Sequence, residues 1–230
     1  MPAEKKGEAR RGATALLIDL EQDGVELLRG VFRQFSIGIE AVSGDVAKVV
    51  GKKKFEACVL RLNDDAGSTL ETVRQSARNR NVPILGICAS APQAMRYSKY
   101  GINAILRDPL DRQDAMRGVR SAHLLIIHEL RRYVRVPIVL ECTVDLIGGG
   151  KLGGVTRDLS YGGMSVITPT RVSVDHTCEI SFTLPNGTGI KMGATITWRH
   201  EPELIGLRFE PADDRRLQIR PWIDEYLKLT

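Results

Sequence analysis

Residues 124–146 read LLIIHELRRYVRVPIVLECTVDL, and the pattern of the chain changes within this stretch. Up to residue 130 the apolar residues follow helical spacing, whereas from residue 138 they belong to a run with β-branched residues, which is typical of a strand. A helix must end before Pro137, because the residue before a proline disfavours the helical conformation. We therefore place a boundary at residues 131–137, between domains at residues 13–130 and 138–230.

Upstream of this boundary, short apolar runs alternate with helical segments. The runs are continuously apolar, which is typical of strands in a parallel sheet that is covered on both faces. Strands are expected at residues 13–19, 37–42, 57–62, 83–88 and 104–106, and helices at residues 25–34, 46–53, 69–79, 92–100 and 112–130. The pattern predicts an α/β doubly wound domain with a parallel five-stranded sheet.

Downstream of the boundary, short β-branched runs are separated by glycine-rich connections. Turns are expected at residues 148–150 and 153–154, and Asn186-Gly187 between two extended runs indicates a hairpin. Strands are expected at residues 138–146, 155–156, 164–168, 177–183, 189–199 and 206–210, and a helix at residues 213–227. This spacing predicts a small antiparallel β-barrel with a C-terminal helix.

Composition narrows the class of protein. The formal net charge of +5 is a mild attraction to phosphates that names no partner. The four cysteines show neither a CxxC pattern nor ligand spacing, so we expect a reducing, cytoplasmic setting without a metal site. No apolar run is long enough to span a bilayer. Residues 1–12 carry charges of both signs, and we expect a disordered tail there rather than a signal peptide.

The order of strands and helices in residues 13–130 resembles the receiver domain of response regulators. Of the receiver's acidic pair after the first strand, Asp19 is kept but Leu20 stands in the second place. The phosphoacceptor position holds Arg61, the Thr/Ser position holds Cys88, and the lysine position holds Asp108, before a proline. A cation cannot accept a phosphoryl group and repels Mg²⁺, so the resemblance implies a pseudo-receiver.

The same alignment puts opposite charges where the receiver has an aspartate and a lysine. We predict that Arg61 and Asp108 form an ion pair with the signs exchanged, because a partly buried charge is costly unless it is paired. The alternative is two unrelated surface residues.

Two short motifs lie near the boundary and in the early barrel. The first is RxxxR, from Arg131 to Arg135, directly before the first strand; the second is DxSxxG, which comprises Asp158, Ser160 and Gly163. With both motifs in this order, the chain from residue 131 to about residue 227 resembles the PilZ family, whose ligand is cyclic di-GMP.

The resemblance implies a role for each motif residue. Arg131 and Arg135 would close over the ligand, since an arginine fork meets guanine O6 and N7 and its plane can stack on a purine. Asp158 would accept guanine N–H groups, and Ser160 would bond the guanine edge or a phosphate. Gly163 would let the backbone approach the ligand. Alternatively, the arginines offset a helix dipole and the DxSxxG residues form a turn.

Two neighbouring arginines are candidates for phosphate contact. Arg132 and Arg157 each stand next to a motif residue and can donate to a phosphate. Leu130 stands where an arginine could have stacked on a second nucleotide, which favours one ligand per chain. The run 148–151 (GGGK) lacks the Ser/Thr and the helix of a phosphate-binding loop, so we set it aside.

These patterns favour a non-enzymatic cyclic di-GMP receptor without a cofactor, whose pseudo-receiver contacts a protein partner. Residues 131–137 would serve as hinge and ligand clamp, so that binding reorients the two domains. The alternatives are a structural adaptor that has lost ligand binding, an enzyme, and a nucleic-acid-binding protein. We find no activated nucleophile, acid/base pair or helix-turn-helix pattern for the last two. A homodimer stays open, and the sequence does not indicate the downstream output.

Overall fold

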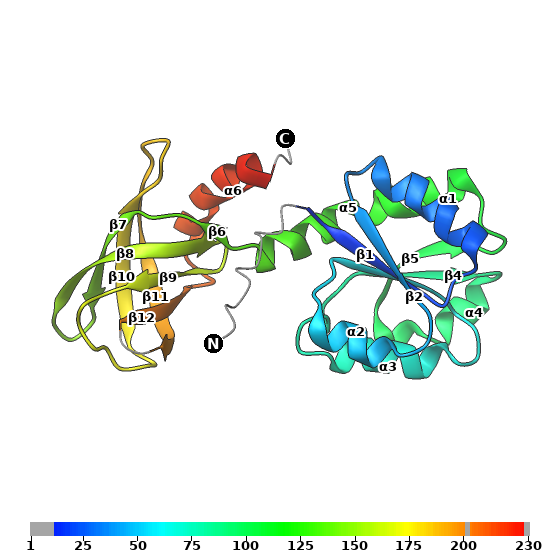
Figure 1. Ribbon diagram of the computed structural model, residues 1–230, viewed down its shortest axis with the longest axis horizontal. Helices are drawn as coiled ribbons and strands as arrows, with labels where there is room; N and C mark the ends of the chain where they lie inside the picture. The colour runs from blue at the N-terminus through cyan, green and yellow to red at the C-terminus, as the bar shows by residue number, and fades with distance from the viewer. Residues whose placement is uncertain (1–11, 201–202, 228–230) are drawn as a thin grey trace, which may run out of the picture. The chain divides into compact units, whose positions relative to one another are not determined.

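The computed structural model describes residues 12–200 and 203–227, which fall into two compact units, and the chain passes from one to the other between Leu130 and Arg131 (Figure 1). Each unit has its own sheet. The tail expected at residues 1–12 lies outside the described residues, apart from Gly12. The division falls where the pattern of the sequence changes.

The first unit is a parallel α/β sheet. Its strand order is β2-β1-β3-β4-β5 and every pairing is parallel. The strands are β1 (Thr14–Ile18), β2 (Gly38–Val42), β3 (Ala57–Arg61), β4 (Ile84–Cys88) and β5 (Ile102–Arg107), and the helices are α1 (Gln22–Arg33), α2 (Val46–Lys52), α3 (Ala66–Gln75), α4 (Ala91–Met95), the 3₁₀ turn η1 (Ser98–Tyr100) and α5 (Arg112–Tyr133). This is the doubly wound order of flavodoxin-like folds, which confirms the expected fold class.

Helices cover both faces of this sheet. Figure 1 shows α1 and α5 against one face and α2 and α3 against the other. The central strands β3 and β4 are almost entirely buried, which explains why their sequences are continuously apolar. Phe32 of α1 and Phe55, just before β3, are among the largest fully buried side chains. The carboxyl ends of β1 and β3 are thereby fixed beside each other.

Helix α5 begins at a cap and ends later than expected. Asp111 accepts the backbone N–H groups of Gln113 and Asp114 at 2.8 and 2.9 Å, which satisfies two of the free donors of the first turn. The sequence placed its end at residue 130, but the helix continues to Tyr133. Nothing in this turn stops a helix, and the positive charges of Arg131 and Arg132 suit its negative C-terminal end.

The second unit is a closed antiparallel barrel. The strand order is β6-β8-β7-β10-β11-β12-β9, and β9 also pairs with β8, which closes the ring. The elements are β6 (Val136–Pro137), β7 (Glu141–Leu146), β8 (Lys151–Ser160), β9 (Gly163–Ile167), β10 (Thr177–Thr183), β11 (Gly189–His200), β12 (Leu204–Phe209), the 3₁₀ turn η2 (Asp214–Gln218) and α6 (Ile219–Leu227). The expected barrel and C-terminal helix are confirmed.

Two details of the second half differ from expectation. Residues 153–154 were expected to form a turn, but both glycines lie inside β8, which is much longer than the predicted strand at residues 155–156. A Cβ on Gly154 would lie 2.7 Å from the carbonyl oxygen of Ile167 on β9, so the glycine permits close packing rather than a turn. Of the segment 131–137, only Val134 and Arg135 lie outside a helix or strand.

Candidate functional site

The two arginines of the RxxxR motif have different surroundings. Arg131 lies in the last turn of α5, and its Nε and Nη2 donate to Oδ1 and Oδ2 of Asp224 on α6 at 2.6 and 2.8 Å. Both side chains are largely buried, with 13% and 16% of their surfaces exposed. Arg135 lies beyond the helix, and its Nη1 donates to Oδ1 of Asp158 at 3.0 Å. Each guanidinium group is therefore held by a different carboxylate.

The DxSxxG motif forms the tight turn between β8 and β9. The hydroxyl of Ser160 donates to the carbonyl oxygen of Gly163 at 2.8 Å, and Ser160 is buried. A Cβ on Gly163 would lie 2.1 Å from the carbonyl oxygen of Leu207 on β12, so this position requires glycine for the strands to pair. Ser160 and Gly163 thus build the turn, as the alternative interpretation of the motif expects, and the turn positions Asp158.

Asp158 is the charged centre of this motif. Its Oδ1 accepts from Arg135, and its Oδ2 accepts from the hydroxyl of Ser165, its register partner on β9. The register of β8 and β9 shifts between Thr156 and Asp158, an irregularity of the kind that re-aims side chains at functional sites. The carboxylate is thereby held in place by one charged and one neutral donor.

A concavity of about 370 Å³ opens beside this ion pair. Its walls come from the segment after α5 and from four strands of the barrel: Arg135, Arg157, Asp158, Ser165, Trp198, His200 and Leu204. The structure therefore brings together three of the residues singled out in the sequence. The other four, Arg131, Arg132, Ser160 and Gly163, do not line it.

The aromatic wall of the concavity was missed in the sequence. Trp198 and His200 are two positions apart on β11, so their side chains lie on the same face of the strand. Their ring centroids are 5.5 Å apart. Trp198 pairs in register with Gly206 on β12. Aromatic residues make up only 5% of the chain, and so low an overall content gives no indication of a single well-placed ring. The motif WxH with a glycine opposite would have been the signal.

The two arginines proposed for phosphate contact, Arg132 and Arg157, also have different surroundings. Arg157 is exposed on β8 and lines the concavity. Arg132 lies in the last turn of α5, with its guanidinium carbon 5.8 Å from the centre of the Tyr133 ring. A further arginine, Arg216 of η2, lies 5.2 Å from the ring centre of Tyr161 in the motif turn. The turn is thus also supported from the C-terminal part of the chain.

The receiver-like positions of the first unit hold an ion pair. Nη1 of Arg61, at the end of β3, donates to Oδ2 of Asp108 after β5, and about a third of each side chain is exposed. The predicted pairing is confirmed. Asp19 accepts the backbone N–H of Gly44 at 3.0 Å, and a small concavity of about 150 Å³ lies between Asp19, Arg61 and Asp65. A guanidinium group therefore lies at the carboxyl end of β3, paired with a carboxylate that follows β5.

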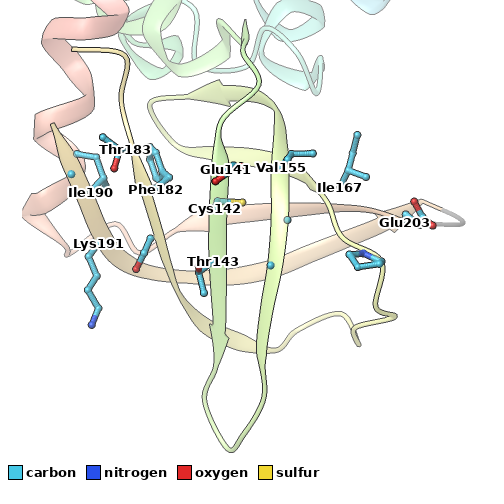
Figure 2. Close-up of a pocket in the computed structure, with 15 residues that line it drawn as sticks. Glu141, Cys142, Thr143, Val155, Ile167, Phe182, Thr183, Ile190, Lys191 and Glu203 are labelled. Carbon is cyan, nitrogen blue, oxygen red and sulfur yellow. The ribbon is translucent and has the colours of Figure 1, made fainter. Parts of the chain in front are cut away.

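A larger concavity of about 1070 Å³ lies along the barrel strands (Figure 2). Thr143, Ser181 and Lys191 follow one another across β7, β10 and β11, and Val155 pairs with Glu141. Its lining mixes small, apolar and oppositely charged side chains, which favours no single ligand chemistry. Burial raises the pKa of the Cys142 thiol on its wall to about 11, which opposes a nucleophilic role at neutral pH.

Two features are absent from residues 12–200 and 203–227. Among these residues, His, Cys, Asp and Glu side chains form no group that could hold a metal ion. No helix in the same ranges combines the length and apolar character needed to cross a membrane.

The second unit is therefore a closed barrel that carries an arginine–aspartate pair beside an aromatic ring. Residues 129–225 match the family model of the PilZ domain, and this part of the chain is a PilZ domain. It follows a domain with the receiver-like strand order. The comparison with curated proteins gives no match.

Solved structures resemble each half of the chain. The PilZ domain of CeSA from a cellulose-synthesizing bacterium is 21% identical, with a TM-score of 0.34, over 40% of this chain and 95% of that one. The PilZ domain of YcgR from Escherichia coli, with c-di-GMP, is 17% identical, with a TM-score of 0.35, over 43% and 92%. The chemotaxis response regulator CheY4 of Vibrio cholerae is 14% identical, with a TM-score of 0.42, over 47% and 97%.

Proposed function

We propose that the chain is a receptor for cyclic di-GMP that binds the dinucleotide through its RxxxR and DxSxxG motifs. The observation that carries the proposal is the Arg135–Asp158 pair beside the ring of Trp198 in one concavity. The family assignment supports the ligand class, because the PilZ resemblance implies cyclic di-GMP. Four free, buried cysteines fit the cytoplasmic setting proposed for such a receptor.

The concavity offers complementary chemistry for a guanine base. Arg135 can donate to the O6 and N7 acceptors of guanine, and Asp158 can accept from its N–H groups. The indole of Trp198 offers a face on which a base can stack. Arg157, exposed on the same rim, can donate to the adjacent phosphate.

The concavity is too small for the whole dinucleotide. Its volume of about 370 Å³ is near the lower end of the roughly 300–1,000 Å³ of small-molecule sites. We therefore assign it one guanine and the neighbouring phosphate. The rest of the dinucleotide falls to the arginines in the last turn of α5, Arg131 and Arg132.

The first domain would act through contact rather than phosphoryl transfer. Arg61 occupies the phosphoacceptor position and is paired with Asp108, so the domain is proposed as a pseudo-receiver that binds a protein partner. Val134 and Arg135 are the residues between α5 and β6. A ligand that engages Arg135 would change the path of this segment and thereby the relative orientation of the two domains.

One observation favours a second candidate, a structural adaptor that binds no nucleotide. Internal groups already satisfy much of the motif: Asp158 bonds Arg135 and Ser165, and Ser160 bonds Gly163. Arg131 is likewise paired with Asp224. The adaptor would keep these contacts at any nucleotide concentration.

Calorimetric titration of the full chain with cyclic di-GMP separates the two candidates. Arg135→Ala should weaken binding about ten- to a hundredfold, since a hydrogen bond to a charged group contributes about 1.5–3 kcal/mol. Arg29→Ala is a matched control, because Arg29 is also about half exposed, at 53% against 52% for Arg135, and lies on α1 of the other domain. A wild-type chain that shows no binding at high micromolar ligand would favour the adaptor.

A further inference from the structure

The arginine that begins the RxxxR motif is already occupied by the chain itself. Arg131 forms two parallel N–H···O bonds, from Nε and Nη2, with the carboxylate of Asp224 on α6. We propose that Asp224 is an internal competitor for the ligand, so that cyclic di-GMP takes Arg131 from α6 when it binds. This inference rests on the proposed function, and it names a residue that lowers the affinity of the chain for cyclic di-GMP.

The competition follows from the geometry of the guanidinium group. A bidentate contact uses two N–H groups on one edge of the fork, and Asp224 uses the edge formed by Nε and Nη2. Guanine O6 and N7, or two phosphate oxygens, ask for the same kind of edge. The pair is largely buried, so water does not weaken it as it weakens a surface pair. A ligand that engages this edge must therefore displace the carboxylate.

Asp224 would not be left without a cation after the exchange. Nε of Arg220, one turn earlier on α6, already lies 3.8 Å from Oδ2 of Asp224. Arg220 is half exposed, so its side chain is free to adjust toward the carboxylate. Because an unpaired buried carboxylate is costly, this second arginine lowers the barrier to exchange. The pair is thus strong enough to reduce affinity without blocking binding.

Loss of the Arg131–Asp224 pair would also affect α6. Ile219, Ile223 and Leu227 are the buried apolar side chains of this helix, and the pair with Arg131 is a polar tie near its C-terminal end. When the ligand takes Arg131 away, α6 loses one of the polar contacts that hold its C-terminal part. Helix α6 should then become more mobile, so it reports ligand occupancy to the surface of the PilZ domain.

The test compares cyclic di-GMP affinities of five full-length chains by calorimetry. They are the wild type, Asp224→Asn, Glu225→Gln, Arg131→Ala and the double variant Arg131→Ala/Asp224→Asn. Asp224→Asn should bind about tenfold more tightly than the wild type, because the competing charge is gone. Glu225→Gln removes one negative charge from the neighbouring, exposed position on α6 and should leave affinity unchanged.

The double variant separates competition from general charge repulsion. If Asp224 acts through Arg131, Asp224→Asn should give no gain when Arg131 is already alanine. A gain that persists in the Arg131→Ala background would contradict the proposal, as would unchanged or weaker binding by Asp224→Asn alone. The latter would assign Asp224 a positioning role instead.

Hydrogen exchange provides a readout that does not depend on affinity. Saturating cyclic di-GMP should speed amide exchange in residues 219–227 of the wild type, and in Asp224→Asn exchange should already be fast without ligand. Slower exchange in α6 on binding would overturn the inference while leaving the proposed function intact. If neither the wild type nor Asp224→Asn binds cyclic di-GMP, the proposed function itself fails.

Discussion

The ring of Trp198 covers Gly206 on the neighbouring strand: a Cβ built on Gly206 would lie 2.0 Å from Cε2 of the indole. The two residues are register partners of β11 and β12. No side chain larger than hydrogen fits beneath the ring, so the glycine determines where the aromatic wall of the concavity lies. A residue without functional groups thereby shapes the candidate site.

Removing the indole should weaken cyclic di-GMP binding. Trp198→Ala is expected to cost about 1–3 kcal/mol of binding free energy, the usual contribution of a base stacked on an aromatic ring. Trp198→Phe keeps a flat aromatic face and should lose less binding free energy than Trp198→Ala. Calorimetry on both variants checks the order, and equal affinities for the wild type and Trp198→Ala would exclude a stacked base at this wall.

Filling the space beneath the indole of Trp198 should also weaken cyclic di-GMP binding, although no functional group is removed. Gly206→Ala must push the indole aside, and overpacking of this kind costs about 1–3 kcal/mol of folding stability. Both the urea midpoint and the affinity for cyclic di-GMP should fall. Gly189→Ala on β11 is the matched control, because a Cβ there meets no atom within 4 Å. Equal effects of the two substitutions would count against the packing argument.

The first domain should not accept a phosphoryl group. The resemblance to receiver domains puts Arg61 at the phosphoacceptor position, where it is paired with Asp108, and a positive charge there would oppose the binding of Mg²⁺. Incubation with acetyl phosphate and Mg²⁺ should leave the intact mass unchanged, whereas an active receiver treated in parallel gains a phosphate. A phosphate adduct on residues 13–130 would refute the pseudo-receiver assignment.

The sequence predicted most of the fold because the decisive patterns are local. Continuous apolar strands and the change of period near residue 131 depend only on neighbouring residues. The roles of Gly154 and Gly163 could not be found this way. Each glycine is required by a backbone atom of another strand, Ile167 or Leu207, and a single sequence contains no such contact.

The candidate site was predicted only in part, for a similar reason. Motif spacing identified Arg135 and Asp158, which do meet. It could not show that Arg131, four residues earlier, pairs with Asp224, because these two residues are 93 positions apart in the sequence. Pairing across that distance depends on where α6, which follows η2 at the end of the chain, places Asp224, and periodicity does not determine that position.

The PilZ domain should lose stability in acid partly through Asp213. Its carboxylate accepts from the side chain and backbone N–H of Arg215 and from the backbone N–H of Gly193, and the Arg215 side-chain bonds hold its pKa well below the ordinary value. A depressed folded-state pKa stabilises the fold above the ordinary pKa of 3.8, and this contribution is lost as pH falls further. Asp213→Asn should therefore reduce the urea midpoint at pH 7, and the difference from the wild type should shrink toward pH 3. A difference that stays constant with pH would rule out the charge as its cause.

Ligand binding should change the distance between the two domains. Val134 and Arg135 are the residues between α5 and β6, and Arg135 bonds the motif residue Asp158. A ligand that engages Arg135 must alter this bond, and a change in backbone path at these positions is transmitted to everything before them. Spin labels at Lys48 and Thr183, both exposed and one in each domain, would measure the change by pulsed electron resonance.

The chain suits this experiment because its four native cysteines are buried, so labelling can be directed to introduced thiols. A label pair at Lys48 and Arg78 lies within the first unit and should give the same distance distribution with and without cyclic di-GMP. The pair that spans the two domains should shift or narrow at saturating ligand, because a ligand changes a conformational equilibrium by its differential affinity for the two states. If binding is saturated and that distribution stays the same, the signal must pass through a change of surface on the PilZ domain alone, with α6 as the element to examine.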